Sequence, residues 1–74
     1  MPYVNIQVTR EGVTKQQKHD LIAGVTRLLF DVLGKDPSHT SVVIEEIELD
    51  NWGVGGEQVS ELRKKGITSK SKKI

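Results

Sequence analysis

Proline at the second position offers the most distinctive chemistry in this sequence. Removal of Met1 would leave a chain that begins with Pro2, whose nitrogen is then a secondary amine. An α-amino group has a reference pKa of about 7.7–8.0, and burial beside an apolar wall or a nearby cation lowers that pKa. Pro2 could therefore exchange a proton near neutral pH or attack a carbonyl to form an iminium. The simpler interpretation is a proline tolerated at the first residue of a strand.

Few other side chains offer catalytic or metal-binding groups. The chain has no cysteine, which excludes thiolate chemistry, disulfides and zinc–thiolate sites. His19 and His39 are far apart in sequence and have no third ligand at useful spacing, so we expect no metal site. Glu45 and Glu46 are neighbours on a predicted strand and face opposite sides of it, so they do not form a paired acid and base.

Composition limits the class of protein. The 74 residues suit one domain, and 11 basic against 10 acidic residues give a net charge of +1, which is not typical of a nucleic-acid binder. Basic residues gather near the end of the chain, but no aromatic residues are interleaved with them, so we expect a solvated tail over residues 63–74. Because no apolar run is long enough for a signal peptide or a membrane span, we expect a cytoplasmic protein without a membrane partner.

Pro2 is followed by four predicted elements that must form the frame around it. Residues 3–9 alternate between apolar and polar side chains, which predicts a strand with one buried face. Thr14, with a glutamine three residues later, is typical of a helix N-cap, and an apolar stripe then continues to Gly34, a residue suited to ending a helix. A second strand is predicted over residues 40–48, and the glycine-rich stretch 50–56 predicts a hairpin or a loop around Trp52.

The order strand, helix, strand and turn predicts an α+β fold. Two strands joined by a helix pair in parallel through a right-handed crossover, which gives a β-α-β protomer over residues 1–62 with a C-terminal turn or hairpin. Two strands and one helix cannot bury a sufficient core alone, and a short chain without disulfides needs another source of stability. We therefore expect oligomerisation to complete the fold.

The same elements carry a family resemblance. The chain resembles the 4-oxalocrotonate tautomerase family, the small members of the tautomerase superfamily, in Met1-Pro2, Thr14, Gln17, Leu33-Gly34, Val43-Ile44-Glu45-Glu46 and Asn51-Trp52-Gly53-Val54-Gly55-Gly56. The resemblance implies a homo-oligomer, a hexamer built as a trimer of dimers, in which the amino-terminal proline is the catalytic base and acid. It also implies a small enol or 2-oxo acid as substrate, no cofactor, and an apolar site wall formed at Trp52.

The sequence departs from the family where substrate is held. Two arginines usually bind a carboxylate-bearing substrate, but the corresponding positions hold Val13 and Ser41. A developing enolate needs a cation or N–H donors. Arg10 is our first candidate, ahead of the Ser41 hydroxyl, backbone N–H groups near the end of the first strand, and Arg63 of a neighbouring subunit. The predicted site is thus catalytic Pro2 with substrate-binding Arg10, Ser41 and Trp52.

Two alternatives remain open. Related proteins use the same proline for hydration, dehalogenation or decarboxylation, although hydration usually needs a further carboxylate near the proline. The loss of both arginines could instead mark a catalytically weak subunit of a hetero-hexamer, whose partner chain carries the missing groups.

Overall fold

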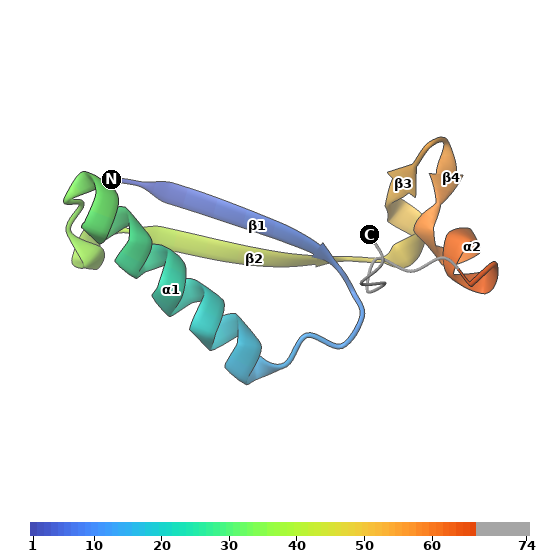
Figure 1. The fold of residues 1–74 in the computed structure, drawn as a ribbon, viewed down its shortest axis with the longest axis horizontal. Helices are drawn as coiled ribbons and strands as arrows, with labels where there is room; N and C mark the ends of the chain where they lie inside the picture. Colours follow the sequence, from blue (N-terminus) through green and yellow to red (C-terminus); the bar gives the residue numbers. More distant parts are fainter. Residues whose placement is uncertain (67–74) are drawn as a thin grey trace.

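A parallel pair of strands crossed by one helix forms the body of the molecule. The computed structural model describes residues 1–66. In it, β1 (Tyr3–Thr9) and β2 (Ser41–Ile47) pair in parallel over their full lengths, and the helix α1 (Lys15–Leu33) connects them (Figure 1). The alternating apolar pattern of β1 thus formed a strand over the predicted residues, and the second strand is slightly shorter than predicted.

The ends of α1 follow from local chemistry. The Thr14 hydroxyl accepts a hydrogen bond from the Gln17 N–H at 3.0 Å, and the Gln17 side-chain oxygen accepts one from the Thr14 N–H at 2.9 Å. This reciprocal pair satisfies two N–H groups that have no partner within the helix. At the other end, Gly34 has a φ of 69°, a left-handed conformation that glycine adopts without strain. Both predicted helix limits are confirmed.

The C-terminal segment beyond β2 is compact. It contains a short 3₁₀ turn (Leu49–Asn51), the strands β3 (Gly53–Val54) and β4 (Glu57–Gln58), and the helix α2 (Val59–Lys64). The two short strands pair antiparallel, so the glycine-rich stretch forms a hairpin rather than a loop. Its turn requires positive φ at two successive glycines, 63° and 86°, a geometry typical of tight hairpins.

The boundary expected after residue 62 falls inside α2. The first two residues of the predicted tail, Arg63 and Lys64, are helical. The remainder of the predicted tail, residues 67–74, lies outside the described residues. The division into a domain and a basic tail therefore stays a prediction.

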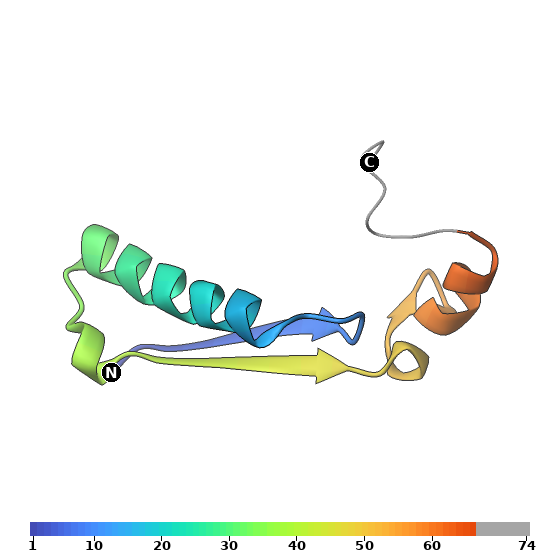
Figure 2. The ribbon, with the colours of Figure 1, turned by 90° about the horizontal axis from the view of Figure 1, so that it is seen from below.

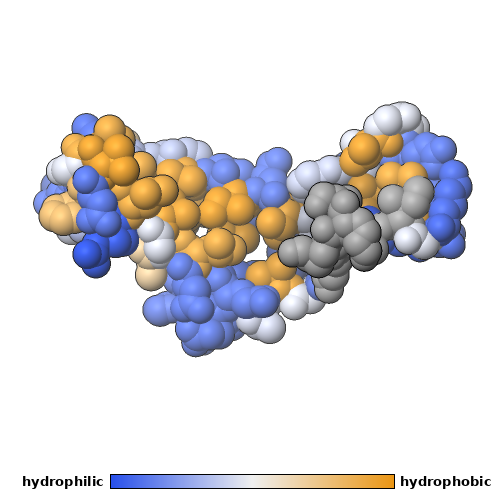
Figure 3. Space-filling view, in the orientation of Figure 1, coloured by the Kyte–Doolittle hydropathy of each residue, from blue (hydrophilic) through white to orange (hydrophobic). Residues whose placement is uncertain are grey.

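Among residues 1–66, no helix or strand covers one face of the β1–β2 sheet. The helix α1 lies along one side of the sheet, and no other element lies on the opposite side in Figure 2. Within residues 1–66, Val59 in α2 is the only buried hydrophobic residue. Large apolar side chains of α1 stay exposed, at 57% for Leu28, 49% for Phe30 and 70% for Val32. Figure 3 shows apolar side chains at the surface over the body of the molecule.

These features establish an α+β protomer of the predicted β-α-β type with a small antiparallel hairpin. None of the helices in the described part of the chain combines the length and the apolarity that a membrane crossing requires.

Candidate active site

Pro2 is anchored at the start of the sheet. Its carbonyl oxygen accepts a hydrogen bond from the backbone N–H of Ser41 at 3.0 Å, one position before the first paired residue of β1. Pro2 is half-buried, while Met1 before it is 91% exposed. The Pro2 nitrogen itself has no hydrogen to donate while Met1 is attached. The two sequence-predicted residues Pro2 and Ser41 therefore do lie together.

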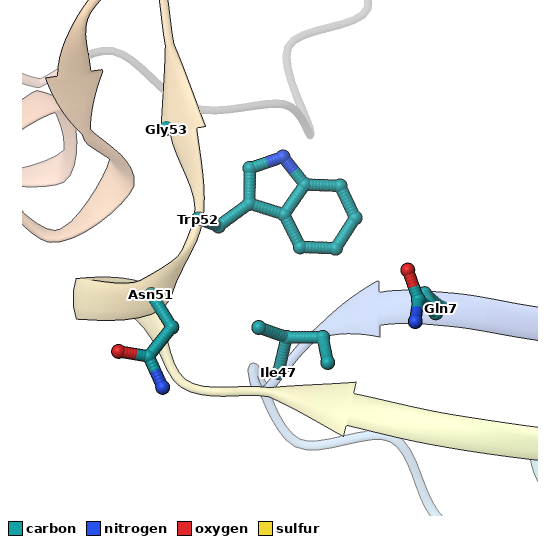
Figure 4. A pocket seen from close by; sticks show the side chains of 5 residues that line it. All are labelled: Gln7, Ile47, Asn51, Trp52 and Gly53. Atoms are coloured by element: carbon teal, nitrogen blue, oxygen red, sulfur yellow. The ribbon is translucent and has the colours of Figure 1, made fainter.

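Trp52 lines an open pocket at the opposite end of the sheet. The pocket has a volume of about 360 Å³ and is lined by Gln7, Ile47, Asn51, Trp52 and Gly53. Figure 4 shows the indole of Trp52 reaching above Ile47 toward Gln7. The backbone near Trp52 is fixed, because its carbonyl oxygen accepts a hydrogen bond from the Val59 N–H at 2.8 Å. Trp52 therefore presents an apolar surface beside the polar amide of Gln7.

Arg10 lies at the same end of the sheet but is engaged with carboxylates. Its Nε atom is 2.7 Å from Oε2 of Glu48, and its Nη1 atom is 3.9 Å from Oε1 of Glu46. The backbone N–H of Arg10 donates to the Ile47 carbonyl at 2.8 Å, which extends the pairing of the two strands. The side chains of Arg10 and Glu48 are 54% and 62% exposed, so this ion pair is a surface pair of small net energy. A substrate carboxylate could therefore exchange with Glu48.

The two adjacent glutamates face opposite sides of β2, as predicted. Glu46 is ion-paired with Lys18 of α1, and hydrogen bonding to that ammonium is the main reason its pKa lies below the usual value. Glu45 is on the uncovered side and accepts hydrogen bonds from Gln7 at 2.9 Å and Asn5 at 3.0 Å. These two amides, with Gln7 first, lower the pKa of Glu45.

The four predicted site residues are divided between the two ends of one protomer. In a parallel pair the starts of the strands lie together and so do their ends, which puts Pro2 with Ser41 and Arg10 with Trp52. At about 3.3 Å per residue, Pro2 and Arg10 are separated by roughly 26 Å along β1. A single protomer therefore does not bring Pro2 and Arg10 to one substrate.

Sequence reasoning missed several residues of the Trp52 end. Gln7 and Ile47 line the pocket, and Glu48 holds Arg10, although none was singled out. The sequence did indicate Gln7 and Ile47. Both lie near the ends of the two predicted parallel strands and face the same side of the sheet, so their side chains must be close together. Across residues 1–66, no group of three or more His, Cys, Asp or Glu side chains could hold a metal ion.

Comparison with known proteins identifies the family. The family model described as "Tautomerase enzyme" matches residues 2–62. The chain is 62% identical over 63 residues to "Probable tautomerase K2" of Dickeya dadantii, covering 85% of this chain and 94% of that protein. It is 34% identical to a 2-hydroxymuconate tautomerase of Comamonas testosteroni, covering 84% of this chain and 97% of that protein.

Solved structures agree. The crystal structure of DmpI from Helicobacter pylori has a TM-score of 0.81 and 42% identity, covering 85% of this chain and 97% of that one. A heterohexamer 4-oxalocrotonate tautomerase from Chloroflexus aurantiacus has a TM-score of 0.76 and 25% identity, covering 85% of this chain and 100% of that one.

The fold and these relatives thus define a small β-α-β enzyme of the isomerase class. The chain belongs to the tautomerase family, and the resemblance seen in its sequence is confirmed.

Proposed function

We propose that this chain interconverts the keto and enol forms of a small enol or 2-oxo acid, with Pro2 as general base and acid after removal of Met1. The observation that carries the proposal is the anchoring of the Pro2 carbonyl by the Ser41 N–H in a chain of this family. In the reaction the Pro2 nitrogen takes the proton of the enol O–H, and the protonated amine then delivers a proton to carbon and returns to its neutral form. The O–H electrons form the carbonyl bond, and the C=C electrons form the new C–H bond.

The developing negative charge on the enolate oxygen requires a donor. Arg10 is the proposed cation, because its pairing with Glu48 is exposed and exchangeable. The Ser41 hydroxyl is the second candidate, since Ser41 lies beside Pro2 and its side chain is exposed. Trp52 is proposed as the apolar wall, which suits the flat carbon skeleton of an enol or dienol such as the substrate in the Comamonas relative's name.

We further propose that the site forms between copies of the chain. Pro2 and Arg10 are roughly 26 Å apart within one protomer, so other copies of the chain must supply the Arg10 and the Trp52 that act with a given Pro2. Exposed apolar side chains on α1 and an uncovered sheet face provide the surface for such contacts. A homo-hexamer built as a trimer of dimers is the assembly we propose; the relative from Chloroflexus is named as a heterohexamer. The cytoplasmic location stays a prediction.

The decisive experiment combines mass with activity. Mass spectrometry of the purified protein should show a chain that lacks Met1. Ketonisation of phenylenolpyruvate, followed by its ultraviolet absorbance, should then fall by at least about a hundredfold in a Pro2→Ala variant, the usual contribution of a general base. Pro37→Ala is the matched control, because Pro37 is the chain's other proline and lies in a surface 3₁₀ turn. Full activity of Pro2→Ala would refute the proposal.

Two other functions are alternatives to this proposal. Hydration, dehalogenation or decarboxylation could use the same amine, but hydration needs a carboxylate to activate water, and Glu45 is already held by Asn5 and Gln7. A catalytically weak subunit of a hetero-hexamer would account for Val13 and Ser41 at the arginine positions. Gel filtration and activity of the chain alone and with a paralogue separate this alternative from an active homo-hexamer.

A further inference from the structure

A bidentate ion pair joins the C-terminal helix to the loop after β1. The Nε atom of Arg63 is 2.6 Å from Oε2 of Glu11, and its second terminal nitrogen, Nη2, is 3.1 Å from Oε1. Both side chains are mostly shielded, with exposures of 20% for Arg63 and 22% for Glu11. Paired donors in a planar fork fix the relative orientation of the two groups as well as their distance.

Glu11 is itself held to the end of the sheet. The Thr9 hydroxyl donates to Oε1 of Glu11 at 2.5 Å, and Thr9 is the last residue of β1, paired with Ile47 of β2. The next residue, Arg10, continues the backbone pairing through its N–H to the Ile47 carbonyl. The carboxylate that Arg63 binds is therefore held to the last residue of β1 by a hydrogen bond, and its backbone directly follows a residue that is paired with β2.

On the other side of the pair, α2 is bound to Trp52. The Val59 N–H, in the first turn of α2, donates to the Trp52 carbonyl, and Val59 is only 4% exposed. The Gln58 side chain also donates to the Asp50 carbonyl at 3.1 Å, which closes the hairpin onto the 3₁₀ turn. Residues 49–64 therefore form one packed unit, which we call the Trp52 unit. Figure 1 shows this unit standing beyond the end of the sheet.

Because the Trp52 unit follows the sheet through a short connection at Glu48, its orientation needs a second attachment. We infer that Glu11 and Arg63 are positioning residues that fix the Trp52 unit against the sheet, so that the Trp52 ring stays above Ile47 and Gln7. The kinetic consequence of this inference rests on the proposed function, whereas the structural consequence does not.

Trp52 is the only tryptophan in the chain, so its fluorescence reports on this geometry in the intact protein. Glu11→Gln and Arg63→Met should each shift the emission maximum to longer wavelength and increase quenching by acrylamide. The emission maximum and the acrylamide quenching of the double variant should match those of either single variant. Residues that act through a shared contact have non-additive effects. Arg63→Lys keeps the charge but loses the planar fork and should give an intermediate result.

The matched control is Lys65→Met. Lys65 forms an ion pair with Glu57 at 2.7 Å within the same C-terminal segment, but both side chains are about half exposed, at 56% and 48%. This variant should leave the emission and the quenching of Trp52 unchanged. Circular dichroism and gel filtration of every variant establish whether its secondary structure and its assembly are intact. If Arg63→Met does not fold, the same fluorescence measurements on Arg63→Lys test the inference.

Kinetics supply a second readout. With phenylenolpyruvate, kcat/KM of the Arg63→Met variant should fall, by up to about a hundredfold, since a misplacement of about 1 Å can have that effect. The loss should appear mainly in KM, whereas Pro2→Ala should act on kcat. Unchanged Trp52 fluorescence in both Glu11→Gln and Arg63→Met would overturn the inference, even in an active enzyme. Absence of ketonisation in the wild type would refute the proposed function and leave the fluorescence test intact.

Discussion

Arg10 and Trp52 lie at the same end of the β1–β2 sheet but on opposite sides of it. Arg10 reaches toward Glu46, whose side chain meets Lys18 of α1, so this side of the sheet is the covered one. Trp52 lines its pocket with Gln7, which bonds to Glu45 on the uncovered side. The proposed cation and the proposed apolar wall of one protomer therefore face different regions, and they need not serve the same substrate molecule.

Substitution of Arg10 and of its partner should have opposite effects on substrate affinity. Arg10→Met removes the proposed cation, and we expect KM for phenylenolpyruvate to rise by about tenfold or more, in line with the roughly 1.5–3 kcal/mol of a hydrogen bond to a charged group. Glu48→Gln removes the carboxylate that competes for Arg10, so KM should fall. Steady-state kinetics at low and at high salt measure both effects. A lower KM in Arg10→Met would mean that Arg10 is not the cation that binds the substrate.

Trp52 should tolerate replacement by another aromatic residue. Trp52→Phe keeps a flat apolar wall and should keep most of the activity, whereas Trp52→Ala exposes Ile47 and enlarges the pocket beside Gln7. We expect kcat/KM to fall by about tenfold or more in Trp52→Ala, corresponding to about 1.4 kcal/mol. Equal activity in the two variants would mean that the ring does not contact the substrate.

The ion pair between Lys18 and Glu46 predicts a dependence of stability on pH. The fold lowers the pKa of Glu46 below its ordinary value of 4.5. The unfolded chain therefore binds a proton at higher pH than the folded one, and the stabilisation is complete above pH 4.5 and is lost as the pH falls through the lower folded pKa. Lys18→Met should lower the melting temperature at pH 6 and weaken its decrease on acidification.

Lys64→Met is the control for this experiment, because its pair with Glu61 is exposed, at 73% and 50% of the two side chains. Thermal melts at several pH values from 6 down to 3 measure the difference. An equal acid dependence in wild type and Lys18→Met would exclude Glu46 as a contributor.

The N-cap of α1 offers a prediction on stability alone. Thr14→Ala removes the hydroxyl that accepts the Gln17 N–H, and such losses destabilise by about 1 kcal/mol. Thr14→Ser keeps the oxygen and should be close to wild type. Urea unfolding at one fixed protein concentration checks both variants. A neutral Thr14→Ala would mean that other contacts hold the start of α1.

Local patterns in the sequence were sufficient for the main elements. The alternation in β1, the capping pair of Thr14 and Gln17, and the glycine at position 34 each act over a few residues, and all three appear in the structure as predicted. The hairpin was left open, because a run of glycines permits several turns and the choice depends on the pairing of Gly53 with Gln58.

The candidate site was harder to predict than the fold. Parallel pairing of β1 and β2 already implies that Pro2 and Trp52 lie at opposite ends of the sheet. A family motif lists such residues along one sequence and does not show how far apart they lie within one protomer. The contact of Glu11 with Arg63 joins residues 52 positions apart. It depends on the path of the whole C-terminal segment, which no local pattern specifies.

The scarcity of buried side chains in the described protomer has a consequence for how mutations are interpreted. Under the proposed assembly, Leu28 is exposed in the isolated chain but contributes to the stability that the copies provide for one another. The free energy of unfolding then depends on protein concentration. Leu28→Ala should act as a core substitution in concentrated solution, and dilution should lower the melting temperature, so that the amount of protein in the cell becomes a determinant of how much of it is folded.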